Sequence, residues 1–396
     1  MYSQSRRHAG RSVYNSKNHQ PRRPAHGQQT IDPSRFIKPA QTPVDEVLFV
    51  PQNRFQDFAI NDLLKTNIIT KGYVQPSPIQ DQAIPLGLAG KDIVGIANTG
   101  TGKTAAFAIP ILNQLINDKL SKVLIIAPAR ELAQQIEVEC RSFAQGSGLK
   151  GAVVIGGTSM SAQIRDLRAN PSVVIGTPGR LKDHIERGTL NLSNFNIVVL
   201  DEVDRMVDMG FINDIRLILG RVNSQRQSYF FSATLDPKLK GLVEAFLNDP
   251  VTISVKTGET SDNVHQDVLR YTTTHDKIDK LQDTLIHTDT QKALIFDATQ
   301  RGVERLNKEL QARGFKVDAI HGGKSQGQRQ RALARFRQNE INILVATDVA
   351  ARGIDIVDIT HVINYNVPKT YDDYIHRIGR AGRAGRAGKA LTFVSN

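Results

Sequence analysis

The sequence lacks several features that define large classes of proteins. A single cysteine among 396 residues excludes an internal disulfide and a cysteine-based zinc cluster. No apolar run reaches the roughly 18 residues that a membrane-spanning helix needs. The N-terminus is polar and basic and has no apolar core of a secretory signal. We therefore expect a cytoplasmic protein that has no contact with a membrane.

Acidic residues are outnumbered, and the excess of positive charge is uneven. The chain has 51 Lys and Arg against 39 Asp and Glu, a net charge of +12 that favours a polyanionic partner. Residues 1–54 hold nine basic and three acidic residues, and residues 374–396 hold five basic and none acidic. The first of these segments is rich in Ser, Gln, Asn, His and Pro. It predicts a disordered basic tail that either captures nucleic acid or acts as a solvating extension.

From residue 55 onward, short apolar runs alternate with stretches of helical period. This pattern predicts buried parallel strands in an α/β fold, and the chain is long enough for two domains. The polar stretch 256–264 has no periodicity and predicts a linker. We expect two doubly wound domains at 55–255 and 265–396, with a cleft between them. The expected strands are Ile93–Ala97, Val123–Ala127, Ala152–Ile155, Val173–Gly176, Ile197–Leu200, Tyr229–Phe231, Ala293–Phe296, Val317–Ile320, Ile343–Ala346, His361–Tyr365 and Ala390–Val394.

A glycine-rich turn between the first of these strands and an apolar helix predicts a phosphate-binding P-loop. Its backbone N–H groups and the helix N-terminus would surround phosphate oxygens. Lys103 would reach the β- and γ-phosphates, and Thr104 would bind Mg²⁺. Ala97 occupies the first glycine position of the strict pattern. The loop residues expected to contact ATP are Gly100, Thr101, Gly102, Lys103 and Thr104.

The strand Ile197–Leu200 ends in a cluster of acidic residues. A carboxylate at the tip of a strand near the P-loop is suited to anchor Mg²⁺, a role we assign to Asp201. Glu202 is placed to orient and deprotonate an attacking water. The alternative, a solvated acidic turn, fits less well with the apolar strand before it.

These motifs, with about ten more in a fixed order, resemble the DEAD-box ATP-dependent RNA helicases over residues 55–396. The resemblance implies two RecA-like domains that use ATP and Mg²⁺ and bind RNA largely without regard to base sequence. It assigns adenine recognition to Phe55, Tyr73 and Gln80, and contact with the ribose to Asp355. Val203 stands where the family's namesake tetrapeptide has Ala, a small neutral change.

The resemblance also implies an RNA surface and a coupling element. Ala129 stands where the family usually has Thr, which removes one hydroxyl donor. Asp204 is expected to receive the hydroxyls of Ser232 and Thr234, and His376 belongs to the same interdomain coupling. The residues expected to contact RNA are Pro128, Arg130, Gly157, Thr177, Arg180, Thr299, Arg329 and Thr347.

Two arginines near the C-terminus complete the expected site. In the family, residues matching Arg380 and Arg383 cross the cleft to the γ-phosphate, a role suited to an always charged, planar guanidinium. The resemblance therefore predicts a monomeric RNA-dependent ATPase that unwinds short duplexes or remodels RNA–protein complexes, with ribonucleoprotein or ribosome-assembly factors as partners. The alternatives are an ATP-gated RNA clamp that does not unwind, a DNA-translocating helicase and an inactive RNA-binding protein. The Gln80 element argues against the DNA helicase, and the intact ATP motifs argue against the inactive protein.

Overall fold

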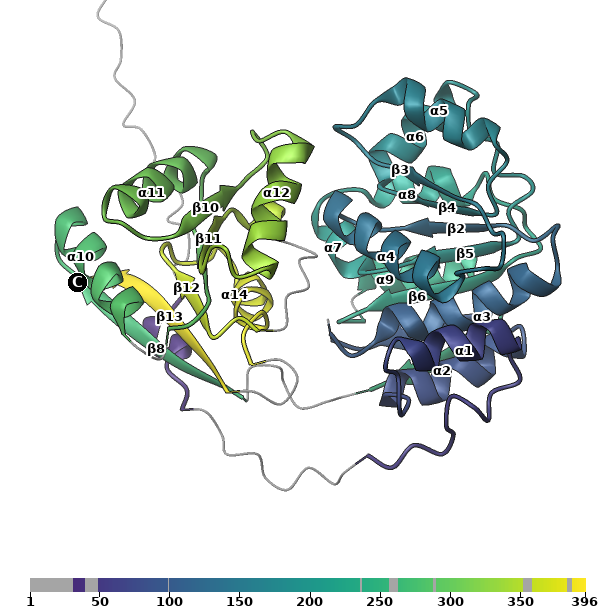
Figure 1. Cartoon of the computed structure of the whole chain (residues 1–396), viewed down its shortest axis with the longest axis horizontal. Helices are drawn as coiled ribbons and strands as arrows, with labels where there is room; N and C mark the ends of the chain where they lie inside the picture. The colour runs from purple at the N-terminus through teal and green to yellow at the C-terminus, as the bar shows by residue number, and fades with distance from the viewer. Residues whose placement is uncertain are drawn as a thin grey trace, which may run out of the picture.

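The computed structural model contains two α/β domains, each built on a parallel sheet (Figure 1). It describes residues 31–39, 49–98, 100–235, 237–255, 263–287, 290–351, 358–382 and 387–396. Among the helices in these ranges, none has the length and apolar character needed to cross a membrane. The predicted fold class, two RecA-like domains in tandem, is confirmed.

The first sheet has seven strands in the order β3-β4-β2-β5-β6-β1-β7, and its pairs are parallel. The P-loop strand β1 lies between β6 and β7, so the loops after β1, β5 and β6 leave the same edge of the sheet. The strands are β1 Ile93–Ile96, β2 Val123–Ile126, β3 Gly151–Val154, β4 Val173–Gly176, β5 Ile197–Leu200, β6 Gln227–Ser232 and β7 Val251–Ser254.

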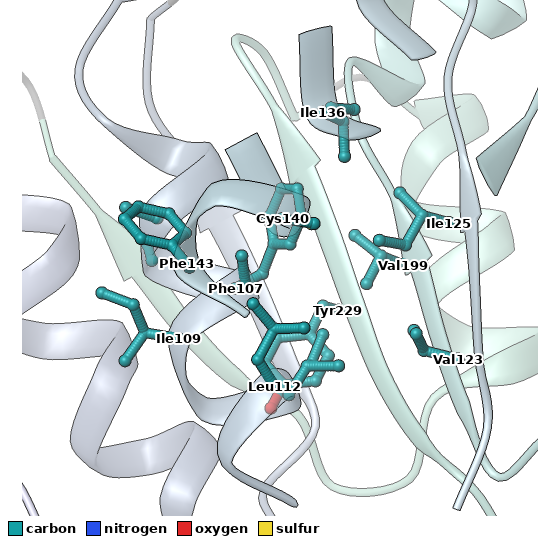
Figure 2. Packing of buried hydrophobic residues seen from close by; sticks show 14 of the residues in the cluster. Phe107, Ile109, Leu112, Val123, Ile125, Ile136, Cys140, Phe143, Val199 and Tyr229 are labelled. Atoms are coloured by element: carbon teal, nitrogen blue, oxygen red, sulfur yellow. The ribbon is translucent and has the colours of Figure 1, made fainter. Parts of the chain in front are cut away.

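Helices cover both faces of this sheet because successive strand residues point to opposite sides and the residues on both sides are apolar. Val123 and Ile125 face one core cluster, and Leu124 and Ile126 face the other. Figure 2 shows the first cluster, in which sheet residues pack against Phe107 and Leu112 of α3 and against α4. The helices are α1 Asp62–Thr70, α2 Pro78–Leu88, α3 Lys103–Asn117, α4 Arg130–Phe143, α5 Met160–Arg168, α6 Pro178–Glu186, α7 Val203–Asp208, α8 Ile212–Leu219 and α9 Pro237–Phe246.

The second sheet has six strands in the order β10-β11-β9-β12-β13-β8. It is also covered on both faces, with Leu294 and Phe296 in one cluster and Ala293 and Ile295 in the other. The strands are β8 Val264–Tyr271, β9 Ala293–Phe296, β10 Val317–Ile320, β11 Ile343–Ala346, β12 His361–Asn364 and β13 Gly388–Ser395. The helices are α10 Thr274–Ile286, α11 Gln300–Ala312, α12 Gln326–Arg337, α13 Asp348–Ala351 and α14 Tyr371–Ile378.

Part of the predicted disordered tail is folded. Residues 31–39 contain a 3₁₀ helix, η1 (Pro33–Phe36), that lies on the second domain beside β8 (Figure 1). Phe36 is completely buried, and the Asp32 side chain caps the helix by accepting a hydrogen bond from the Ser34 N–H. The prediction of disorder over 1–54 therefore does not hold for this segment, because one aromatic anchor and an edge strand are enough to dock it.

The chain also joins the first domain before residue 55. The backbone N–H groups of Gln52 and Asn53 donate to the buried Asp81 carboxylate at 2.8 and 3.1 Å. Within the predicted linker, residues 256–262 lie outside the described ranges, whereas Val264 is fully buried and begins β8.

Candidate active site

The P-loop connects β1 to α3 through two glycines in left-handed backbone conformations. Gly100 has φ of 85° and Gly102 has φ of 89°, values that glycine adopts without the strain of a Cβ atom. At Gly102 an added Cβ would lie only 2.3 Å from Gln80 Nε2. The loop therefore needs glycine there for both backbone conformation and space. Thr99, within the same loop, lies outside the described residues.

Lys103 is the first residue of α3 and is buried. Its Nζ donates to the Ala97 carbonyl at 3.0 Å, so the loop's own backbone holds the ammonium group. The hydroxyl of Thr101 donates to the Asn98 carbonyl at 2.9 Å. The Thr101 carbonyl accepts the Ser77 hydroxyl at 2.7 Å. These bonds keep the loop compact and bind it to α2.

Three buried carboxylates follow β5, which is separated from β1 by β6, and Asp201 and Glu202 are the first two. Burial raises the pKa of Asp201 to about 6, the Lys103 ammonium lowers it, and the adjacent Glu202 raises it further. Glu202 has φ of 54°, a left-handed backbone conformation that is strained for a residue other than glycine. Its Oε2 forms a buried ion pair with Arg205 Nη1 at 3.2 Å.

The third carboxylate, Asp204, connects the acidic turn to the end of β6. Its Oδ2 accepts the backbone N–H groups of Ala233 and Thr234 at 2.9 and 3.3 Å. The prediction that hydroxyls make this bridge is wrong for Ser232, because its Oγ is buried without a hydrogen-bond partner in the described part of the chain. Backbone amides take the role because they project beyond the last strand residue toward the acidic turn.

The predicted adenine-reading residues lie next to the P-loop but are already engaged. Gln80 is buried, accepts the Ser77 N–H at 2.9 Å and donates to the Gly102 carbonyl at 3.1 Å. Tyr73 donates its hydroxyl to Glu139 Oε1 at 2.9 Å. Phe55 is only 2% exposed and meets the Tyr73 ring edge-on, with centroids 5.6 Å apart. Phe55 is thus placed to support Tyr73 from within the core.

A cavity of about 720 Å³ lies between the domains, within the size range of small-molecule sites. Gly100, Gly102, Lys103 and Thr104 line it together with Asp201 and Glu202. The second domain contributes Arg380 and several residues of α12 to the same cavity. The predicted site residues Arg383 and Asp355 lie outside the described ranges.

Helix α14 brings His376 to the acidic turn of the first domain, while the next residue, Arg377, pairs within the second domain. His376 Nδ1 lies 3.4 Å from Arg205 Nη2 of the first domain. Burial and the Arg205 charge lower the pKa of His376 to about 4, so the ring is neutral near pH 7 and accepts from the guanidinium. Arg377 forms two bonds to the Asp348 carboxylate at 2.6 and 2.8 Å. Nothing in the sequence distinguishes Arg205 and Arg377 from ordinary helix arginines; only their contacts do.

The predicted RNA residues of the first domain lie at loops that follow strands. Arg130 begins α4, and its guanidinium lies against Gly157, where an added Cβ would approach Nη1 to 2.3 Å. Thr177 is the N-cap of α6 and makes no side-chain capping bond. Arg180 lies in the same helix, 3.7 Å from the Asp183 carboxylate. Pro128 precedes α4 in the loop after β2.

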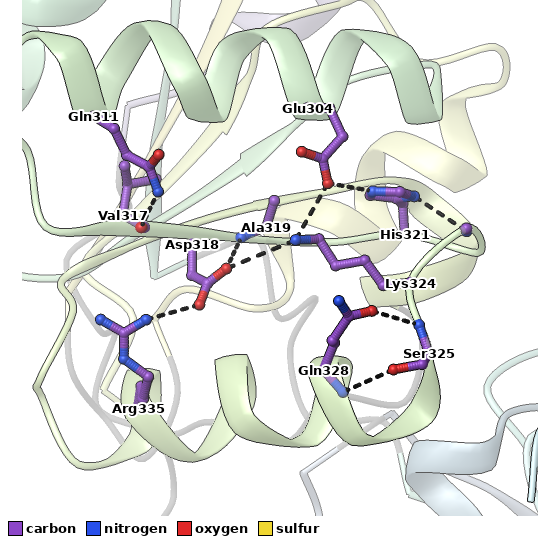
Figure 3. A network of polar contacts seen from close by, with 11 residues as sticks. Glu304, Gln311, Val317, Asp318, Ala319, His321, Lys324, Ser325, Gln328 and Arg335 are labelled. Carbon is purple, nitrogen blue, oxygen red and sulfur yellow. Dashed lines mark hydrogen bonds and ion pairs between the residues drawn. The ribbon is translucent and has the colours of Figure 1, made fainter.

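In the second domain, a polar network fixes the start of α12 (Figure 3). Glu304 pairs with His321 at 2.7 Å and with Lys324 at 3.2 Å. Ser325 and Gln328 form a capping box at the helix N-terminus. Two other predicted RNA residues also sit at helix starts: Thr299 caps α11, and the Thr347 carbonyl accepts the N–H of Ala351.

Helix α12 contacts the first domain through Glu131 of α4. Arg329 Nη2 lies 2.9 Å from Glu131 Oε2, and Gln326 Nε2 donates to Glu131 Oε1 at 3.1 Å. All three side chains are buried. Arg329, predicted to contact RNA, thus pairs here with a carboxylate across the domains. The motif around Glu131 resembles an RNA-binding element, and nothing in the sequence points to these contacts, because Gln326 and Arg329 are distant in the chain.

Two RecA-like domains that share a cavity lined by a P-loop, a carboxylate cluster and an arginine define a two-domain P-loop ATPase. A family model described as DEAD/DEAH box helicase matches residues 77–242, and one described as helicase conserved C-terminal domain matches residues 276–385. The DEAD-box ATP-dependent RNA helicase CshA of Bacillus subtilis is 44% identical over 343 residues, covering 86% of this chain and 69% of CshA. The chain therefore belongs to the DEAD-box family and is an ATP-dependent RNA helicase, an ATPase that acts on RNA.

Other relatives and solved structures support the same family. The ATP-dependent RNA helicase CshA of Limosilactobacillus reuteri is 42% identical over 344 residues, covering 86% of this chain and 69% of that protein. The structure is similar to S. cerevisiae Dbp5 bound to RNA and ADP BeF3, with a TM-score of 0.77, 28% identity and coverage of 86% and 89% of the two chains. It is also similar to Mss116p bound to ssRNA and AMP-PNP, with a TM-score of 0.78, 29% identity and coverage of 91% and 77%.

Proposed function

We propose that the chain hydrolyses ATP in the interdomain cavity and closes its two domains on RNA, which separates short duplexes or remodels RNA–protein complexes. The observation that carries this proposal is that one cavity is lined by Lys103, Asp201 and Glu202 of the first domain and by Arg380 of the second. A site divided between domains is complete only when the domains meet. Hydrolysis would therefore be linked to domain closure.

Within this cavity, Lys103 exchanges its bond to the Ala97 carbonyl for the β- and γ-phosphates. Thr104 and Asp201 are the residues that would hold Mg²⁺, which neutralises phosphate charge when bound. Asp201 fits this role because it is a carboxylate buried in the cavity wall, where burial raises its pKa and a bound cation would offset the cost of burying its charge. Mg²⁺ commonly uses only one or two protein ligands beside phosphate oxygens and water. Accordingly, the described residues need not contain a larger metal cluster, and none is found there.

Glu202 acts as the general base that takes a proton from the attacking water. Arg380 and Arg383 stabilise the charge that develops on the transferred phosphoryl group, an effect that can reach about a thousandfold. Asp355 binds the ribose. Gln80 hydrogen-bonds the adenine edge, and its bond to the Gly102 carbonyl links the bound base to the P-loop. Tyr73, which packs against Phe55, stacks on the base.

RNA lies across both domains on the loops that carry the predicted RNA residues. Contacts to phosphates and sugars from helix N-termini and arginines would make binding largely independent of base sequence. Because ATP and RNA both favour the closed state, each should increase the affinity for the other. Asp204, the end of β6 and His376 couple the two sites, since they connect the acidic turn to α14.

An ATP-gated RNA clamp without productive unwinding is the second candidate, because the same residues would serve it. We further propose that the protein acts as a cytoplasmic monomer within ribonucleoprotein or ribosome assembly. Light scattering of the purified protein tests the oligomeric state.

The deciding experiment measures ATPase activity with and without RNA, and strand separation of a short duplex, for the unaltered chain and for Glu202→Gln. We expect RNA to stimulate ATPase at least tenfold. The variant should bind ATP and RNA but turn over very slowly. Stimulated ATPase without strand separation would favour the clamp. Rapid turnover by Glu202→Gln would overturn the role of Glu202 as base.

A further inference from the structure

Residues 31–39, which we call the N-terminal strap, lie on the second domain although they precede the first domain in sequence (Figure 1). The strap lies outside both ranges matched by the helicase family models, 77–242 and 276–385. Its contacts converge on α14, the helix that precedes Arg380.

Two side chains of η1 pack on one face of α14. The Phe36 ring lies 4.7 Å from the Tyr374 ring between centroids, and both residues are completely buried in the same core cluster. The Arg35 guanidinium lies over the Tyr371 ring, 4.0 Å from its centroid. Tyr371 and Tyr374 are three residues apart, so they form adjacent positions on one helix face.

A hydrogen-bonded link joins the strap to the same helix through β8. Lys38 and Gln266 exchange two backbone bonds of 3.0 and 2.8 Å, which extend the exposed edge of the sheet. The Gln266 side chain is only 2% exposed, and its Oε1 accepts the Tyr374 hydroxyl at 3.0 Å. Burial raises the pKa of Tyr374 well above its usual range, so its hydroxyl remains a donor.

Helix α14 carries functional groups away from this face. His376 contacts Arg205 of the first domain, and Arg380 follows the helix and lines the ATP cavity. An eight-residue helix moves as one body over about 12 Å, so a contact on one face restricts the residues on the other. We infer that the N-terminal strap positions α14, with Phe36 and Arg35 as positioning residues for Arg380. This inference rests on the proposed function of Arg380 in ATP hydrolysis.

The test compares Phe36→Ala and Phe36→Leu with Leu281→Ala as a matched control. Leu281 is also fully buried in the second domain but belongs to the core cluster on the other face of the sheet. We expect Phe36→Ala to lower the RNA-stimulated kcat about tenfold while the KM for ATP changes less than twofold. Phe36→Leu should restore most of this loss. Leu281→Ala should lower the melting temperature as much, yet keep kcat within twofold of the unaltered chain.

Hydrogen exchange gives a readout that does not depend on activity. Phe36→Ala should raise amide exchange in residues 371–380 at least tenfold, whereas Leu281→Ala should not. Equal exchange in the two variants, or equal losses of kcat, would overturn the strap's role. Absence of RNA-stimulated ATPase in the unaltered chain would instead overturn the proposed function. If Phe36→Ala does not fold, Arg35→Ala against Arg35→Lys tests the same point, with the lysine variant expected to retain the exchange protection that alanine loses.

Discussion

Replacing Glu131 by glutamine should weaken the contact between the two domains. In the structure the Glu131 carboxylate meets Arg329 at 2.9 Å and Gln326 at 3.1 Å, and its side chain is 3% exposed against 9% for Arg329. The substitution keeps the size of the side chain but removes its charge. It leaves the Arg329 guanidinium buried beside a neutral amide.

The size of the effect follows from the burial of the pair. A hydrogen bond to a charged group contributes about 1.5–3 kcal/mol, and each 1.4 kcal/mol changes an equilibrium constant about tenfold. The larger penalty known for breaking a permanently buried pair, about 3–5 kcal/mol, does not apply, because here the domains can separate and let water reach Arg329. We therefore expect the equilibrium between domains in contact and domains apart to shift about ten- to a hundredfold toward separation.

Energy transfer between one dye on each domain measures this equilibrium in single molecules. The matched control is Glu137→Gln in the same helix, where Glu137 pairs with the exposed Arg141 four residues later. Such exposed pairs contribute only about 0.3–0.5 kcal/mol and do not cross the domains. If Glu131→Gln and Glu137→Gln give the same distribution of transfer efficiencies, Glu131 does not hold the domains together.

Three further predictions concern the P-loop, the acidic turn and the tail. Gly102→Ala should lower the free energy of unfolding in a denaturant titration by at least about 1–2 kcal/mol through backbone strain. The loss should exceed that of Gly90→Ala, because Gly90 has a similar φ of 75° but no atom within 4 Å of an added Cβ. Because the folded pKa of Asp201, about 6, exceeds its unfolded value, this carboxyl favours the folded state at low pH, and that contribution is lost as pH rises from about 4 to 6. Asp201→Asn should thus raise the melting temperature at pH 8 but not at pH 4, and an equal rise at both would refute the shift. Deleting residues 1–30, which hold six Lys and Arg, should flatten the dependence of log RNA affinity on log salt by about 0.7 for each phosphate that these residues neutralise, and an unchanged slope would show that the tail does not touch RNA.

The sequence pattern predicted the apolar strands well, including the edge strands β3 and β10, but missed two strands of mixed polarity. Strands buried on both faces, such as β4 and β5, are continuous apolar runs, and their predicted bounds are the observed ones. Strands β7 and β8 were not predicted, because they mix exposed polar residues with a few buried ones and so contain no continuous apolar run. The strap was not predicted for a related reason, since its docking depends mainly on one aromatic residue whose partners are more than two hundred residues away.

At the site, motif order predicted which residues meet, but not the bonds they make. Lys103, Asp201, Glu202 and Arg380 line one cavity, as two domains closing on one nucleotide would require. Sequence spacing gave no indication that Gln80 donates to the Gly102 carbonyl of the P-loop or that backbone amides donate to Asp204. Those details depend on loop conformation, which a pattern of residue types does not specify.

Arg205 shows why such details matter for coupling. Its guanidinium meets Glu202, the proposed base, at 3.2 Å and neutral His376 of the other domain at 3.4 Å. Neither Glu202 Oε2 nor Arg205 Nη1 has a hydrogen bond within the described ranges, so both groups depend on the ion pair between them. A movement of α14 that shifts His376 would therefore alter the contacts of the guanidinium that pairs with Glu202. The strap packs on the opposite face of the same helix, so α14 connects residues far from the nucleotide to Glu202, the proposed base.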